Sequence, residues 1–170
     1  MSINPRYTNL LGFLGCAGLL AFAYYLQYGQ GLDPCPLCII QRVAFLALGL
    51  VFLAAALHNP KGFGRHVYTA LLVLTAVAGI ALAIRHLWLQ SLPPDRVPAC
   101  GPDLAFMLRN FPLQETINTV LRGSGSCANV DWRFLGLTIP GWALVWFLVL
   151  GGGGVVTNEW LGRRTRQSQT

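Results

Sequence analysis

Four long apolar runs divide this sequence, and each is close to the length that a helix needs to cross a membrane. A helix rises about 1.5 Å per residue, so about 20 mostly apolar residues span the roughly 30 Å of hydrocarbon in a bilayer. The sequence therefore predicts an all-α membrane protein, a single-domain bundle of four transmembrane helices. The predicted helices cover residues 10–28, 39–57, 67–89 and 139–157.

Polar segments rich in turn-forming residues separate these runs. A short one, 29–34, joins the first two runs, and a long one, 91–138, joins the last two. Within the long segment, apolar residues recur at helical spacing through 104–121, with a break at Pro112. This pattern predicts a short amphipathic helix that lies on the membrane surface or, as the alternative use of the same stripe, docks a protein partner.

Composition and charge support a membrane protein and orient it. Of the 170 residues, 54% are hydrophobic and only 11% are charged, whereas soluble domains carry about 25% charged residues. Basic residues near the ends of the runs predict cytoplasmic termini, with 29–34 and 91–138 outside. The net charge of +6 is thus a topology signal, and nucleic acid is not an expected partner. The orienting residues are Arg6, Lys61, Arg65, Arg163, Arg164 and Arg166.

The first run also admits a second interpretation. Ala21-Phe22-Ala23 follows an apolar stretch and fits the small-x-small pattern of a signal-peptide cleavage site. However, only Arg6 precedes the run as a positive charge, and apolar residues continue to Leu26. A retained transmembrane helix is the favoured prediction.

The motif Cys35-Pro36-Leu37-Cys38 carries the strongest chemical signal in the chain. Pro36 suits the first position of a helix, so the second helix is predicted to begin at the motif. The positive end of the helix dipole there stabilises a thiolate, which is the reactive form of cysteine. Arg42 follows Cys38 by four residues and Cys35 by seven, so we expect it on the same helix face, pointing at the sulfurs. The motif predicts a redox-active pair.

The other cysteines leave more alternatives open. Cys100 and Cys127 bracket the long outer segment in turn-rich surroundings, so a disulfide between them could open and close, or could simply staple a loop. Cys16 lies among small apolar residues, and its predicted role is structural. For the Cys-x-x-Cys motif the alternatives are a static disulfide or half of a zinc site. A zinc site needs a second pair at short spacing, which the sequence lacks, so no metal is expected.

Ionisable residues and a run of glycines inside the predicted transmembrane helices are unusual and need an explanation. Arg85 and His86 come late in the third run, near the predicted outer interface. Arg85 is expected to anchor the helix there, while His86 could hydrogen-bond a neighbouring helix or donate to a bound carbonyl group. Glycines 151–154 in the fourth run are predicted to let helices approach closely.

These residues together resemble the DsbB family of bacterial inner-membrane proteins. The resemblance covers nearly the whole chain, and its motifs form a specific combination. It rests on Cys35-Pro36-Leu37-Cys38 followed by Gln41-Arg42, on His86 upstream of Cys100, and on Cys127 leading into Trp132-Arg133-Phe134-Leu135-Gly136-Leu137, with Pro140 and Trp142.

The resemblance implies an enzyme, a thiol:quinone oxidoreductase that generates disulfides through a relay of four cysteines. A reduced thioredoxin-like dithiol protein of the periplasm, DsbA, would attack the position of Cys100. Cys127 would then be released to attack Cys35, and the electrons would reach Cys38. From there they would pass to ubiquinone or menaquinone.

The same resemblance places Arg42 and His86 at the quinone site and the chain in the bacterial inner membrane, in contact with lipid and the quinone pool. Two other functions compete with this one. A vitamin K epoxide reductase-like enzyme also combines a helix bundle, a Cys-x-x-Cys motif and quinones, but this chain carries the motif on its second helix instead of near its last. A non-enzymatic membrane scaffold or metal carrier with structural disulfides would reduce no quinone when mixed with a dithiol protein.

Overall fold

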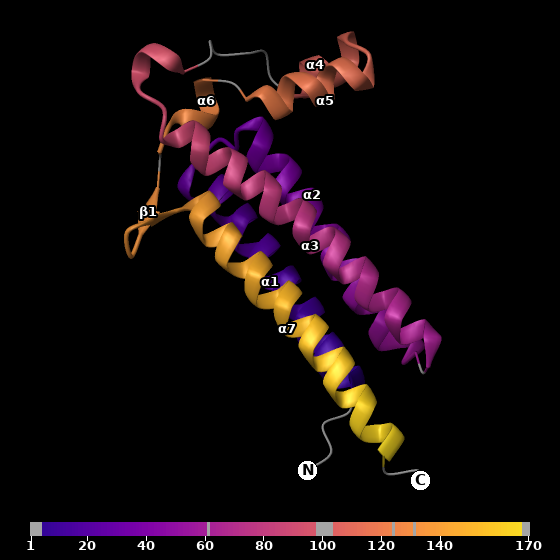
Figure 1. The fold of residues 1–170 in the computed structure, drawn as a ribbon. Helices are drawn as coiled ribbons and strands as arrows, with labels where there is room; N and C mark the ends of the chain where they lie inside the picture. Colours follow the sequence, from indigo (N-terminus) through magenta and orange to yellow (C-terminus); the bar gives the residue numbers. More distant parts are fainter. Residues whose placement is uncertain (1–4, 61, 98–103, 124, 131, 168–170) are drawn as a thin grey trace.

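The computed structural model describes residues 5–60, 62–97, 104–123, 125–130 and 132–167, with side chains up to residue 160. It is a bundle of four long helices (Figure 1), and each contains a stretch long and apolar enough to cross a membrane. The four predicted spans are therefore confirmed as helices, and each helix extends past its apolar run at one end or both. The helices are α1 (Pro5–Gln30), α2 (Pro36–His58), α3 (Phe63–Gln90) and α7 (Ile139–Gln167).

The helix ends follow from local backbone chemistry. Helix α2 ends at Asn59, which adopts the left-handed conformation with φ 41° and donates its N–H to the carbonyl of Ala55. Asparagine tolerates this conformation better than most residues, and the bond satisfies a carbonyl left over at the helix end. Helix α1 runs without a break through Ala21-Phe22-Ala23. The signal-peptide alternative therefore gains no support from the local backbone.

The core of the bundle lies where α2, α3 and α7 meet. Phe45 of α2 stacks on Phe147 of α7 with ring centroids 3.9 Å apart, and Phe52 and Leu72 are buried in the same cluster. Cys16 of α1 joins this cluster and is 1% exposed. Its surroundings confirm the structural role predicted for it.

Glycines bring α3 and α7 close together. A β-carbon added at Gly151 would lie 2.5 Å from the β-carbon of Ala76 in α3, and one at Gly154 would lie 2.7 Å from the ring of Phe52 in α2 and 3.3 Å from Leu72 in α3. At Gly152 and Gly153 a β-carbon would meet no described atom within 4 Å. The predicted packing role is thus confirmed for the first and last glycines of the run, which face the bundle.

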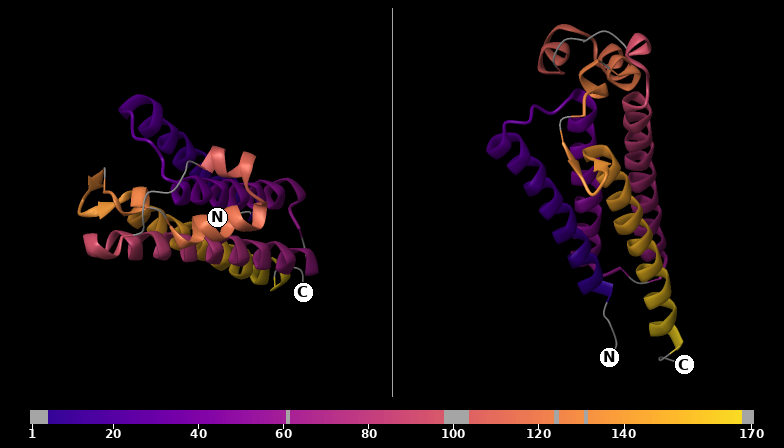
Figure 2. Two further views of the ribbon diagram at one scale, coloured as in Figure 1. Left: turned by 90° about the horizontal axis from the view of Figure 1, so that it is seen from above. Right: turned by 90° about the vertical axis from the view of Figure 1, so that its left-hand side faces the viewer.

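Short elements cover one end of the bundle, opposite to both termini (Figure 2). The amphipathic helix predicted across 104–121 is two helices, because Pro112 ends one and caps the next. Their buried residues Met107 and Val120 pack with Leu37 of α2 and Leu89 of α3. Most of their other apolar side chains stay exposed, so a surface-lying role remains a prediction. These elements are η1 (Pro94–Arg96), α4 (Leu104–Asn110), α5 (Leu113–Arg122), α6 (Gly125–Ala128), β1 (Arg133–Phe134) and β2 (Leu137–Thr138).

Arg85 attaches α5 to α3. Its guanidinium donates to the carbonyl oxygens of Leu121 at 3.0 Å and Arg122 at 2.9 Å, and it lies 4.2 Å from the ring centroid of Trp88. The last carbonyls of a helix lack partners inside it and carry partial negative charge, so a cation there is favourable. The described bonds of Arg85 thus go to the end of α5, and the anchoring at the membrane interface stays a prediction.

Strands β1 and β2 form a hairpin that the sequence analysis did not predict. Its two turn residues, Leu135 and Gly136, have φ values of 51° and 82°, and two positive φ values are typical of the tight turn whose twist matches a two-stranded ribbon. Trp142 of α7 donates its indole N–H to the carbonyl of Phe134 at 3.0 Å. The hairpin is thereby held against the start of α7.

Candidate functional site

The Cys-x-x-Cys motif lies at the N-terminal end of α2, as predicted. Cys35 is the N-cap residue and Pro36 takes the first helical position. The Cys35 sulfur accepts a hydrogen bond from the backbone N–H of Cys38 at 3.4 Å, as a serine oxygen does in an ordinary cap. The two sulfurs are 3.2 Å apart. The start of the helix thus places both sulfurs side by side, where opening and closing a bond between them needs little movement.

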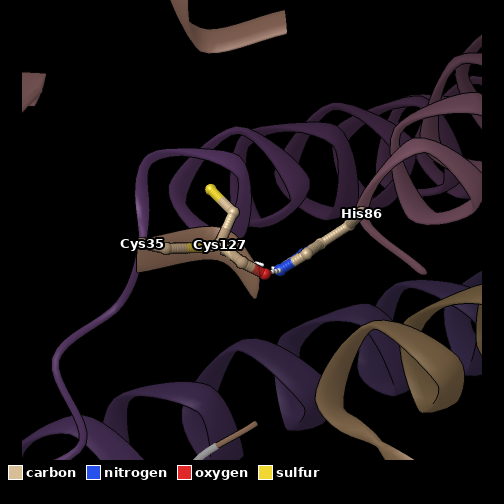
Figure 3. A group of neighbouring side chains, drawn as sticks. All are labelled: Cys35, His86 and Cys127. Atoms are coloured by element: carbon tan, nitrogen blue, oxygen red, sulfur yellow. Dashed lines mark hydrogen bonds between the residues drawn. The ribbon is translucent and has the colours of Figure 1, made fainter. Parts of the chain in front are cut away.

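A histidine links this pair to a third cysteine (Figure 3). His86 reaches from α3, with its Nε2 atom 3.7 Å from the Cys35 sulfur and 3.1 Å from the carbonyl oxygen of Cys127 in α6. A carbonyl oxygen only accepts, so this contact assigns the ring proton to Nε2. Cys35, His86 and Cys127 each offer a ligand-type atom, and these atoms lie within 4.8 Å of one another. The fold therefore brings together three of the predicted site residues from three separate elements.

The same three atoms have the chemistry of a partial metal site. A structural zinc ion takes four ligands in tetrahedral geometry, and this group supplies three. The expectation that the protein holds no metal stays a prediction. Cys100, the fourth cysteine of the predicted relay, lies outside the described residues.

An apolar cavity of about 550 Å³ opens beside the motif. Its wall comes from α1, the start of α2, the hairpin and the start of α7, and Figure 2 shows α1 leaning away from α7 at this end of the bundle. Cavities that bind small molecules typically have about 300–1,000 Å³ and a mostly apolar lining with a few polar groups. The polar residues in this wall include Cys38, Gln41, Arg42, His86 and Gln90.

Arg42 lies in the cavity wall with Cys38, but its described hydrogen bonds go to α1. Its Nη1 donates to the side-chain oxygen of Gln27, its Nη2 donates to the carbonyl of Ala23 at 3.1 Å, and the guanidinium lies 5.1 Å from the ring centroid of Tyr24. The spacing of Arg42 from the two cysteines predicts a cation that points at the sulfurs. Its contacts instead connect α2 to α1, because acceptors on a neighbouring helix cannot be seen in the spacing of α2 alone.

Gln41 is a polar residue of the site that the sequence placed in the family motif but did not predict as a binding residue. It is 4% exposed and lies in the cavity wall, and its Nε2 has no hydrogen-bond partner among the residues that the structure describes. The available signal was its position three residues after Cys38, which puts both on one side of α2. Its burial could not be read from that spacing.

Comparison with known proteins identifies the family. The family model described as "Disulfide bond formation protein DsbB" matches residues 5–157. The Disulfide bond formation protein B of Nitrosococcus oceani is 60% identical over 89% of both chains. That of Hahella chejuensis is 60% identical over 86% of this chain and 88% of the relative, and that of Methylococcus capsulatus is 55% identical over 87% and 90%. This chain therefore belongs to the DsbB family and is a multi-pass membrane oxidoreductase of disulfide bond formation.

Proposed function

We propose that this protein generates disulfides de novo, by reoxidising a periplasmic thioredoxin-like dithiol protein of the DsbA type and passing the electrons to a membrane quinone. One observation carries the proposal. The Cys35 and Cys38 sulfurs are 3.2 Å apart at the wall of an apolar cavity. The Cys127 sulfur lies within 4.8 Å of the Cys35 sulfur. In this arrangement, electrons from thiols would reach Cys35 through Cys127, and a hydrophobic electron acceptor would bind in the cavity beside Cys38.

The thiol steps are a chain of disulfide exchanges. A thiolate of the partner attacks Cys100 in a Cys100–Cys127 disulfide, and Cys127 leaves as a thiolate. Cys127 then attacks Cys35 in the Cys35–Cys38 disulfide, and Cys38 leaves. The second thiolate of the partner then displaces Cys100, which completes the partner's disulfide. Cys100 attacks Cys127 in the Cys35–Cys127 bond, which re-forms Cys100–Cys127 and leaves Cys35 and Cys38 as a dithiol. Each exchange makes one S–S bond and breaks one. The closeness of Cys127 to Cys35 supports the second exchange, while the role of Cys100 rests on the resemblance.

His86 has a place in the exchange between the two pairs. Its Nε2–H donates to the carbonyl of Cys127, and the same atom lies 3.7 Å from the Cys35 sulfur. An imidazole N–H this close to a sulfur stabilises the thiolate electrostatically, and its bond to the Cys127 carbonyl holds α6 beside Cys35. His86 also lines the cavity, so it serves both the exchange and the quinone site in this proposal.

The residues in the cavity wall fit a quinone. Apolar and aromatic side chains suit the ring and isoprenoid tail of ubiquinone or menaquinone, while Arg42 and Gln41 supply donor groups for its two oxygens and His86 lies in the same wall. A quinone held there would accept the two electrons and two protons that the Cys35/Cys38 dithiol releases as it closes to its disulfide. The residues of the wall hold the ring beside Cys38 and exclude water from the exchange.

The test uses the purified protein in detergent micelles with a short-tailed ubiquinone and a reduced thioredoxin-like dithiol protein. Quinone absorbance should fall in step with the appearance of the partner's disulfide. A Cys38→Ser variant should consume no quinone. Its Cys35 thiolate can still attack Cys127 in the Cys100–Cys127 disulfide and release Cys100, so peptide mass spectrometry should detect a Cys35–Cys127 disulfide. If the protein is a non-enzymatic scaffold, neither the parent nor the Cys38→Ser variant would consume quinone. An epoxide reductase would instead turn over vitamin K epoxide with the same dithiol.

A further inference from the structure

The side-chain amide of Gln41 is a buried donor that has no acceptor among the described residues. Gln41 is 4% exposed, and within the part of the chain that the structure describes its Nε2 makes no hydrogen bond. The large majority of buried polar side-chain atoms in proteins are hydrogen-bonded, because an unpaired donor loses its bonds to water and gains nothing in return. An exception beside a cavity suggests an acceptor supplied from outside the chain.

A second glutamine in the same wall shows the ordinary arrangement. Gln90 donates from Nε2 to the carbonyl of Asn129 at 3.4 Å and accepts at Oε1 from the Thr138 hydroxyl at 2.9 Å. Its amide is thus bonded at both ends within the protein. Arg42 likewise has its described bonds to α1. Gln41 differs from both, since its donor is not committed to any described group.

The chemistry of the unpaired atoms distinguishes Gln41 from His86. His86 Nδ1 is also buried without a described partner, but with the proton on Nε2 it is an acceptor. An oxidised quinone offers two carbonyl oxygens, which only accept hydrogen bonds. A ring whose single proton lies on Nε2 has no free donor for it, whereas the amide of Gln41 has one.

The position of Gln41 directs this donor to the reacting pair. It follows Cys38 by three residues on α2, and both side chains line the cavity. The terminal torsion of glutamine is broad, so a rotation of the amide presents its N–H groups to a ligand without disturbing the helix. We propose that the Gln41 amide donates a hydrogen bond to one carbonyl oxygen of the quinone and positions the ring beside Cys38. This inference rests on the proposed quinone function and adds a specific binding residue to it.

Binding to quinone-free protein tests the inference directly. Trp132, Trp142 and Trp146 line the cavity, so titration of the purified full-length protein with a short-tailed ubiquinone should quench tryptophan fluorescence. Gln41→Met keeps an unbranched side chain of similar length and removes the amide. Because a neutral hydrogen bond contributes modestly, the dissociation constant should rise about 3-fold to 10-fold. The matched control is Gln30→Met, the same change at an exposed residue of α1, which should bind like the parent.

Thermal unfolding separates ligand binding from a structural role. Without quinone, Gln41→Met should unfold at a higher temperature than the parent, because it removes an unpaired buried donor. With quinone, its gain in unfolding temperature should be smaller than the parent's. In turnover with a dithiol protein, KM for quinone should rise while kcat is retained. A glutamine that only supports the fold would lower the quinone-free unfolding temperature instead.

Equal dissociation constants for the parent and Gln41→Met would overturn the inference and leave the quinone function standing. A Gln41→Met protein that does not fold would also overturn it, since the amide would then be required by the fold. If the parent itself shows no quenching and no stabilisation by quinone, the proposed function fails and this inference fails with it.

Discussion

Replacing Gly151 by alanine adds one methyl group at a close contact of the fourth long helix, α7, with the third, α3. The new β-carbon would lie 2.5 Å from the β-carbon of Ala76, whereas ordinary contacts at such positions are 3.4–4 Å. Ala76 has no rotatable side chain, so its methyl group cannot swing away, and it is buried in the core cluster with Phe147 and Leu72. The α3 and α7 backbones must therefore separate locally by about 1 Å, which forfeits part of the dispersion energy of the surrounding contacts.

Overpacking of this kind typically costs about 1–3 kcal/mol, and we expect the free energy of unfolding to fall by that amount. Gly152→Ala is the matched control, because its β-carbon would meet no described atom within 4 Å. There the change only removes the conformational freedom of glycine, and stability should rise by up to about 1 kcal/mol. The same glycine-to-alanine change should thus lower the free energy of unfolding at position 151 and raise it at position 152.

Reversible unfolding in mixed micelles of a mild detergent with increasing dodecyl sulfate, followed by circular dichroism, measures both variants. The double variant Gly151→Ala with Ala76→Gly should recover much of the lost stability, since it removes the atom that clashes. If Gly151→Ala and Gly152→Ala shift stability in the same direction by similar amounts, the close approach of α3 and α7 at this point is refuted.

Three further predictions concern the site and its outer cover. Arg42→Ala should raise KM for quinone, and it should lower the free energy of unfolding by about 1–3 kcal/mol because it removes the described bonds to Gln27 and Ala23. Arg42→Lys should restore part of the activity. Unchanged quinone kinetics in Arg42→Ala would remove Arg42 from the site. Arg85→Ala should speed hydrogen exchange in α5 severalfold, as expected for loss of a cap contributing about 1 kcal/mol, with exchange in the middle of α3 as the internal reference; equal exchange in both proteins would argue against the cap. In intact cells treated with a reductant, a membrane-impermeant thiol reagent should label Cys100, and labelling only after the cells are broken would reverse the proposed orientation.

The features that sequence alone predicted are those set by local chemistry. Apolar length decided the four spans, because a helix must cover the hydrocarbon whatever its neighbours are. The start of α2 followed from Pro36 and the cysteine before it, since an N-cap depends on a few consecutive residues. Pro112 likewise marked the division between α4 and α5. Each of these signals lies within one turn or one run of the chain.

Other features depend on how the helices are rotated and tilted against one another, and only the tertiary structure decided them. The spacing of α2 put Arg42 on the face of the cysteines, but the lean of α1 supplied Gln27 and Ala23 as its partners. Of four consecutive glycines, two meet other helices because a helix turns its successive residues about 100° apart. Two further features arise in the same way. The amide of Gln41 is buried without a described hydrogen-bond partner, and the Cys35 sulfur contacts His86. They need contacts between residues far apart in the chain, and no local pattern encodes those.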